Sequence, residues 1–352
     1  MSRAVLLLGV LACLGCATSP PPAPPAGGLD HLERGQALLA RGETAAAAAA
    51  LREALRAQPD LTSARASLGR ALYALGDLDA AVEELRAALR RQPDALDARL
   101  TLATVLVARQ EWPAARAELQ RVLDAQPDRL EAHYALGVVR YAQGDGAGAI
   151  DAYRRVLALD PRQHDARYNL ALVLTLARRE AEATPEFVTA ARAGHARAQY
   201  FAGTAYAAGL GVGRSLAAAI GWWFLAAEQG VPEADEALAQ LRQVALGRSR
   251  GAPVERHAAE QAFAEYRARL WQDFPDLAAA GEDTLGAALL RRGRVGEAVA
   301  MLIREASALS EPAHRQLQAL YEEGVDGLPA RDPRILTYMK SAAAEGLRPS
   351  PR

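Results

Sequence analysis

The chain has 352 residues, of which 51% are hydrophobic and only 5% aromatic, and its 41 basic and 42 acidic residues nearly cancel. Alanine supplies much of the apolar share, and because alanine forms helices well and strands poorly, the composition excludes a mainly β sandwich or barrel. Apolar residues recur along most of the chain, which excludes general disorder. Arginines interleaved with acids indicate solvated helix faces, so we expect no nucleic-acid partner.

Residues 1–16 have the features of a secretory signal. A basic residue precedes an apolar run over residues 4–14, which is too short for a stable transmembrane helix, and small residues flank Cys16. This stretch resembles a bacterial lipoprotein signal, which implies that Cys16 is the lipidated residue, with Cys13 as a second candidate. Ordinary cleavage after Ala17, giving a soluble periplasmic or secreted protein, is the alternative.

A proline-rich segment follows the signal. Residues 17–28 include the string S-P-P-P-A-P-P-A-G-G, which favours an extended backbone and cannot pack into a core. We expect this segment to tether the folded part to a lipid anchor. The residue after Cys16 is not aspartate, and the lipoprotein resemblance then implies the outer membrane of a bacterial envelope, facing the periplasm. Because both cysteines lie in the signal, the folded part is expected to have no disulfide and no cysteine metal site.

Four segments of the chain repeat with a step of 34 residues. Four columns keep this step: Gly35, Gly69, Ala103 and Gly137; Gly42, Gly76, Gln110 and Gly144; Ala47, Ala81, Ala115 and Ala149; and Pro59, Pro93, Pro127 and Pro161. Small residues let paired helices approach closely, glycine takes the positive φ of a tight turn, and proline stops or starts a helix. The columns resemble the tetratricopeptide repeat (TPR), a helix–turn–helix unit of this length.

The TPR resemblance implies an all-α fold, a right-handed α-solenoid of antiparallel helix pairs in which stacked neighbours build the core. The units are expected at 28–61, 62–95, 96–129, 130–163 and 164–197. The fifth unit is degenerate, because it lacks the turn glycine and the terminal proline.

The pattern changes from residue 196 onward. Residues 196–231, with the pair Trp222 and Trp223 followed by the string A-A-E-Q-G, resemble a Sel1-like repeat, a slightly longer relative of the TPR. The rest of the chain is expected to form degenerate helical repeats at 232–307, a second Sel1-like repeat at 308–347 and a tail at 348–352. At the two tryptophans, packing against a neighbouring helix is favoured over an aromatic platform for sugars or peptides.

The sequence contains no motif that indicates catalysis. A phosphate-binding loop, a zinc-binding H-E-x-x-H helix and a G-x-S-x-G elbow are all missing from the sequence. The six histidines fall in different units without metal-ligand spacing on one helix face. We therefore expect no enzyme, no cofactor and no metal.

The inner face of the array is the candidate site. In TPR arrays the first helix of each unit lines a concave groove, and the resemblance implies that its second, fifth, ninth and twelfth positions face that groove. The groove residues predicted here are Arg70, Tyr73, Leu100, Val107, Tyr134, Val138, Tyr141, Tyr168 and Leu172, with acids at Asp97, Glu131 and Asp165 on the rim. Such a strip suits a partner helix or extended segment with apolar anchors. Cover by the chain's own C-terminal units is the competing interpretation.

Together these features predict a non-catalytic protein–protein interaction scaffold, anchored by lipid in the bacterial envelope. The scaffold would hold a segment of a partner protein in its groove and so aid the assembly of an envelope complex. An accessory module that binds glycan or peptidoglycan through aromatic side chains is the alternative from another class. A soluble secreted TPR adaptor is a weaker alternative.

Overall fold

The structure of the protein, a computed structural model, describes residues 27–249, 253–278 and 281–347. Within these ranges it contains nineteen α-helices and no β-strand, and one isolated bridge joins two residues of a loop near the C-terminus. The predicted all-α fold is confirmed. None of the helices in these ranges is both long and apolar enough to cross a lipid bilayer.

Several predictions concern residues outside the described ranges. The expected signal at 1–16 with its lipidation site Cys16, the tether up to residue 26, and the tail at 348–352 all lie there. They remain predictions from the sequence.

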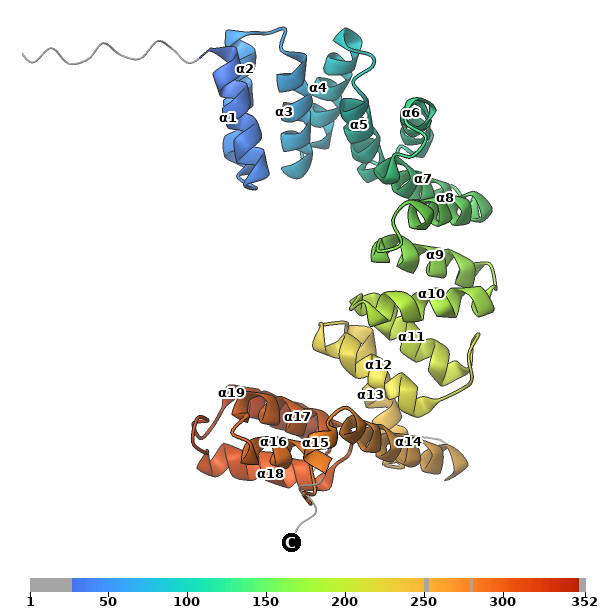
Figure 1. The fold of residues 1–352 in the computed structure, drawn as a ribbon, viewed down its shortest axis with the longest axis vertical. Helices are drawn as coiled ribbons and strands as arrows, with labels where there is room; N and C mark the ends of the chain where they lie inside the picture. The colour runs from blue at the N-terminus through green and yellow to red at the C-terminus, as the bar shows by residue number, and fades with distance from the viewer. Residues whose placement is uncertain (1–26, 250–252, 279–280, 348–352) are drawn as a thin grey trace, which may run out of the picture. The chain divides into compact units, whose positions relative to one another are not determined.

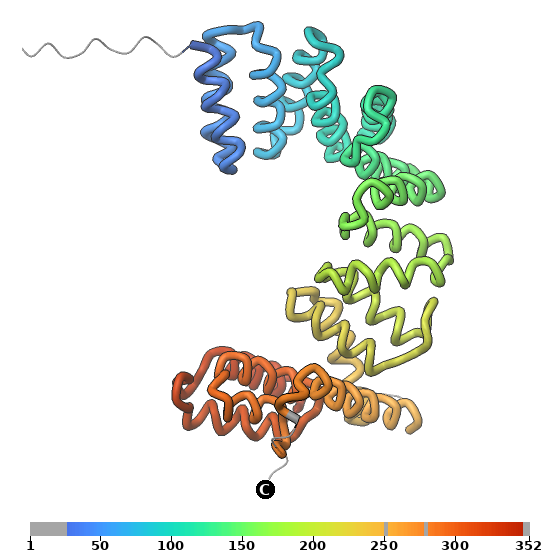
Figure 2. The backbone as a smooth tube through the Cα atoms, in the orientation of Figure 1, coloured from blue at the N-terminus to red at the C-terminus, as the bar shows by residue number. Residues whose placement is uncertain are grey.

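The described residues form two compact units, divided after residue 124. Figure 1 labels their helices. The described helices of the first unit are α1 (Gly28–Ala40), α2 (Thr44–Ala57), α3 (Thr62–Ala74), α4 (Leu78–Arg91), α5 (Leu96–Ala108) and α6 (Trp112–Ala125). The second unit contains α7 (Leu130–Ala142), α8 (Gly146–Leu159), α9 (His164–Leu176), α10 (Glu180–Arg192), α11 (Ala196–Ala208), α12 (Leu216–Glu228), α13 (Pro232–Ala245), α14 (Pro253–Gln272), α15 (Pro275–Ala278), α16 (Leu285–Arg291), α17 (Val295–Ser307), α18 (Glu311–Glu323) and α19 (Pro333–Ala344). Figure 2 shows the backbone reversing at the short links between successive helices.

The helix boundaries follow the repeat of the sequence. The first helices of five successive pairs, α1, α3, α5, α7 and α9, begin 34 residues apart, at residues 28, 62, 96, 130 and 164. The two helices of the pairs α1/α2, α3/α4, α7/α8 and α9/α10 pack on each other, and α2, α4, α8 and α10 also pack on the first helix that follows them. Each pair therefore covers an apolar face of its neighbour, which one pair alone would leave exposed to water.

The small residues of the repeat lie where paired helices touch. A Cβ atom at Gly35 would lie 2.6 Å from Leu51 Cγ, and one at Gly69 would lie 2.5 Å from Leu85 Cγ, so only glycine fits there without movement. The alanine column of the second helices, Ala47, Ala81, Ala115 and Ala149, is completely buried. Close helix pairing thus explains a half-apolar chain with few large side chains.

The turn inside each pair keeps one backbone conformation in all five units. Gly42, Gly76 and Gly144 have φ values of 77°, 82° and 81°. The equivalent residues of the third and fifth units, Gln110 and Arg178, adopt the same left-handed region with φ values of 61° and 57°. The fifth unit, expected to be degenerate, therefore has the same turn without its glycine.

A further column of the repeat joins successive units through a basic side chain. Arg65 donates to Glu84 Oε2 at 2.9 Å and to the carbonyl oxygen of Pro59 at 3.2 Å. In the fourth unit His133 Nε2 donates to the carbonyl oxygen of Pro127 at 2.7 Å. The other members of this column pair in the same way: Arg99 with Glu118 and Pro93, and Arg167 with Glu186 and Pro161. The proline column thus supplies carbonyl acceptors at the joints between units.

The chain after α12 contains one more hairpin with TPR spacing. In α16 and α17 the residues Gly286, Gly293, Ala298 and Leu302 have the same mutual spacing as Gly69, Gly76, Ala81 and Leu85. Gly293 has a φ of 72°, as the turn glycines of the repeat do. The stretch expected to be degenerate therefore keeps a TPR hairpin, although its first helix has only seven residues.

The last helix, α19, is joined to α13 by an ion pair. Arg242 Nε and Nη2 donate to the two carboxylate oxygens of Glu345 at 2.6 and 2.7 Å. Gln243 and Arg248 donate to the carbonyl oxygen of Glu345 at 3.1 and 2.9 Å. Because the carbonyl groups at a helix end lack intrahelical partners, these bonds cap α19 as well as holding it.

Candidate functional site: the inner faces of the repeat helices

In the first compact unit, which ends at residue 124, the predicted groove residues lie on the first helices of two neighbouring repeats. Arg70 and Tyr73 are on α3, and Leu100 and Val107 are on α5. Helix α3 packs on both α1 and α5, so these side chains belong to one stack. Arg70 is exposed and the other three are half-buried. The inner face of the first unit is therefore an accessible, mainly aliphatic strip with one cation.

In the second compact unit, which begins at residue 125, Tyr134 is held in place by its neighbours. Its hydroxyl accepts a hydrogen bond from Asn169 Nδ2 at 3.0 Å, which joins α7 to α9. Its ring meets that of Tyr153 edge-on, with centroids 6.0 Å apart. Burial raises the pKa of the Tyr134 hydroxyl above its usual value. Tyr134 is thus held in place by contacts with α8 and α9.

Tyr168 lies in an aromatic cluster that joins α9, α10 and α11. Its ring stacks on that of His195 with centroids 4.6 Å apart and an angle of 26° between the planes. The rings of Phe187 and Phe201 lie 6.0 and 5.9 Å from it. Burial raises the pKa of the Tyr168 hydroxyl, and the nearby Arg197 guanidinium opposes this rise. These aromatic rings pack together behind the predicted face and join its helices.

The most accessible predicted residue of the second unit is Tyr141. Its side chain is 48% exposed at the C-terminal end of α7, while Val138 on the same face of the helix and Leu172 on α9 are half-buried. The face therefore offers one projecting aromatic side chain above partly buried aliphatic ones. Such an arrangement provides apolar area at a small entropic cost to an incoming segment.

The two tryptophans of α12 have different surroundings. Trp223 is buried against α11, where a Cβ atom at Gly203 would lie 2.5 Å from its Cδ1. Trp222 is half-buried and packs beside the cluster of apolar residues around α9 and α10. Trp223 is therefore not accessible to a sugar or peptide.

Sequence reasoning missed several residues of the second unit's inner face. Asn169, His195, Arg197 and Phe201 all contact the predicted tyrosines. His195 also caps α11, because its Nδ1 accepts from the backbone N–H of Ala198 at 3.1 Å. A search for aromatic residues in the helix that follows the fifth unit would have found Phe201, whereas the role of Asn169 depends on the distance between two helices.

The inner faces have the chemistry of contact surfaces. In the part of the chain that the structure describes, no group of three or more His, Cys, Asp or Glu residues is placed to hold a metal ion. The predicted residues contribute aromatic and aliphatic area, phenol hydroxyls and one exposed guanidinium. Groups of these kinds are the ones that bind peptide segments in other proteins, by packing and hydrogen bonding.

Comparison with known proteins decides the repeat family. Residues 31–168 match the family model described as the TPR domain of cytochrome c-type biogenesis protein H. This stretch of the chain consists of tetratricopeptide repeats. The match spans the helices with the 34-residue step up to α9, and it confirms the TPR resemblance found in the sequence columns. The Sel1-like resemblance after residue 196 lies outside the match and remains a prediction.

Solved structures with TPR helices resemble part of the chain. MamA from Desulfovibrio magneticus RS-1 is 23% identical over 46% of this chain and 92% of its own, with a TM-score of 0.44. TTC0263, a thermophilic TPR protein of Thermus thermophilus, is 23% identical over 47% of this chain and 90% of its own, with a TM-score of 0.40. No curated protein matches the sequence. The identification therefore rests on the repeat columns, the helix pairs and the family match.

Proposed function

We propose that this TPR protein is a non-catalytic scaffold that binds a segment of a partner protein on the inner faces of its first helices. The observation that carries the proposal is the exposure of Tyr141 above the half-buried Val138 and Leu172. Apolar side chains left accessible on a folded surface commonly mark contact sites. The 48% exposure of Tyr141 argues against cover by the chain's own C-terminal helices at this position.

The proposal further places the scaffold in a bacterial envelope, anchored by lipid at Cys16 and facing the periplasm, where it aids assembly of an envelope complex. Its support is the short apolar run, the flanking small residues and the proline-rich segment after them. A proline-rich tether of this length would hold the repeat units away from the membrane surface.

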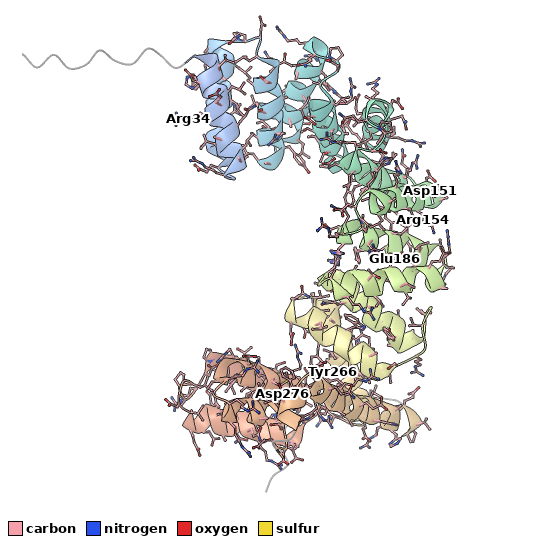
Figure 3. The ribbon with its side chains drawn as sticks, in the orientation of Figure 1. Arg34, Asp151, Arg154, Glu186, Tyr266 and Asp276 are labelled. Carbon is pink, nitrogen blue, oxygen red and sulfur yellow. The ribbon has the colours of Figure 1, made fainter. Side chains whose placement is uncertain are left out.

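Partner binding is tested by comparing two variants of similar exposure. Tyr141→Ala removes an inner-face side chain from α7, whereas Asp151→Ala removes an exposed side chain from α8, labelled in Figure 3. We expect Tyr141→Ala to weaken capture of a specific envelope protein and Asp151→Ala to leave it unchanged. Equal capture by both variants, or binding to isolated sacculi in place of a protein, would refute the proposal.

The anchor is tested separately. The full chain and its Cys16→Ala variant are expressed in a diderm bacterium, and the membrane fraction is analysed by mass spectrometry. The proposal expects a lipid mass on residue 16 of the full chain and a soluble Cys16→Ala variant. A variant that stays in the membrane fraction would contradict the anchor and leave the binding proposal standing.

A further inference from the structure

A second apolar surface of the second unit lies between α12 and α14. Its walls are two stripes with helical spacing: Ala218, Gly221, Trp222 and Leu225 on α12, and Tyr266, Arg269 and Leu270 on α14 with Asp273 directly after that helix. Together with Arg304 of α17 they enclose a cavity of about 320 Å³. There is free space above Gly221, because an added Cβ there would contact only Tyr266, at 3.5 Å. We call this surface the α12–α14 groove.

Helix α12 is apolar on every face. Its sequence, L-A-A-A-I-G-W-W-F-L-A-A-E, has a single charged residue, Glu228. Ile220, Trp223 and Phe224 are buried, whereas Leu225 is 37% exposed. A helix that is apolar on every face is normally buried by neighbouring elements on every side. In the described chain, no element covers the face of α12 that carries Leu225.

The other repeat pairs do not have a large apolar residue at the position of Leu225. Counted from the start of each second helix, the tenth residue is Leu225 in α12, but Glu53, Ala87, Arg121, Arg155 and Thr189 in α2, α4, α6, α8 and α10. The seventh residue is Trp222 in α12, where Glu84, Glu118 and Glu186 form the ion pairs of the repeat. The apolar groove is therefore a local departure from the array.

The rim of the groove carries a cation without a partner. Arg269 is exposed on α14, and within the described residues no ion pair or hydrogen bond joins it to another side chain. The neighbouring Arg304, by contrast, pairs with Glu228. The rim also carries the acid Asp273, so an incoming carboxylate is favoured on the Arg269 side of the groove and disfavoured beside Asp273.

We propose that the α12–α14 groove binds an amphipathic helix of a partner protein, with an Asp or Glu beside its apolar stripe. A helix fits because both walls are helices with stripes at i, i+3, i+4 and i+7, the arrangement that receives a third helix. Helix α13 packs in this way on the other side, against both α12 and α14. The acidic residue of the partner is assigned to Arg269.

The test is a selection from a displayed library of amphipathic helices on the immobilised full chain. In this library an apolar stripe is fixed and all other positions are random. We expect enrichment of helices with Asp or Glu beside the stripe. Their affinity should fall at least about tenfold on Leu225→Arg and on Arg269→Glu, whereas the inner-face variant Tyr141→Ala should bind as the wild type. A selected helix with its acidic residue changed to Arg should regain affinity for Arg269→Glu.

Three results would overturn the proposal. The first is that no helix is enriched, or that enriched helices bind Leu225→Arg as tightly as the wild type. The second is that Arg269→Glu changes nothing, which removes the acidic partner residue. The third is that the full chain sediments as a dimer that Leu225→Arg dissociates, in which case a second copy of the chain occupies the groove. Because Leu225 is partly exposed, melting curves of the variant check that the fold is retained.

Discussion

At the scale of single residues, the repeat depends on a few positions where a side chain of one helix fills the space above a small residue of the other. Gly137 meets Tyr153 as Gly35 meets Leu51, in each case with a partner 16 residues later. The sequence columns predicted that these positions are small. They could not predict which side chain fills the space, because that depends on how the second helix is rotated.

Adding a methyl group at such a position should destabilise the protein. A Cβ at Gly69 would lie 2.5 Å from Leu85 Cγ, so Gly69→Ala forces the helices apart and should lower the free energy of unfolding by about 1–3 kcal/mol. Gly296 in α17 is the control, because an added Cβ there meets no atom within 4 Å. Gly296→Ala should leave stability unchanged or raise it slightly. Thermal unfolding measures both, and equal effects would contradict the packing account.

The turn column supports a prediction of opposite sign. Arg178 has a φ of 57°, a conformation that costs most residues energy and glycine almost none. Arg178→Gly should therefore raise the free energy of unfolding by about 0.5–1 kcal/mol. The adjacent Ala177 has a φ of −80°, so Ala177→Gly should be neutral or destabilising. Chemical denaturation of the two variants checks this, and a destabilised Arg178→Gly would show that the arginine side chain has an unrecognised role.

At the scale of helices, local links follow from the sequence and distant ones do not. The first helices begin at residues 28, 62, 96, 130 and 164, as the columns predicted, because each turn and each joint is encoded within a few residues. The pair Arg242–Glu345 joins residues 103 positions apart, and no periodic signal marks it. The α12–α14 groove was missed for the same reason, since the tryptophan pair alone suggested only packing.

Breaking the Arg242–Glu345 pair should loosen α19. The side chain of Arg242 is only 8% exposed, so a partner without charge leaves a nearly buried cation poorly compensated. We expect Glu345→Gln to speed amide hydrogen exchange in α19 and to lower stability by about 1.5–3 kcal/mol. Glu323→Gln, at an exposed site at the end of α18, is the matched control. Unchanged exchange in α19 would show that packing alone holds it.

At the scale of the whole molecule, three buried tyrosines make a contribution to stability that should change with pH only in the alkaline range. Burial raises the pKa of Tyr153, Tyr266 and Tyr338, all in the second unit, above the usual value of 10.0. Tyr266 is labelled in Figure 3 on α14. Because the folded state favours the neutral phenol, this stabilisation is complete below the unfolded pKa and is lost as the pH rises through the folded one.

The melting temperature of the second unit should therefore fall between about pH 10 and about pH 12, and Tyr153→Phe should make the fall shallower. Melts at constant ionic strength across this range measure it. A melting temperature that stays level would mean that these phenols ionise without opening the fold.

The fold of the whole chain follows from the sequence to a greater degree than its function does. Repeat columns specify the helix pairs, and the family match over residues 31–168 agrees with them. The proposed partner would be selected by side chains whose combined surface no column describes, such as the aromatic cluster around Tyr168 and the exposed Tyr141. The identity of a bound segment therefore has to be measured.

The central claim is that the inner faces bind a protein segment. The most direct measurement places a photo-crosslinking amino acid at Tyr141 or Leu172, and in parallel at the outer-face residues Asp151 and Arg155 of α8, in the full chain expressed in a diderm bacterium. The claim predicts a crosslink from both inner-face positions to one and the same protein, and none to it from α8. Crosslinks from α8 alone, or from the inner face only to the chain itself, would contradict it.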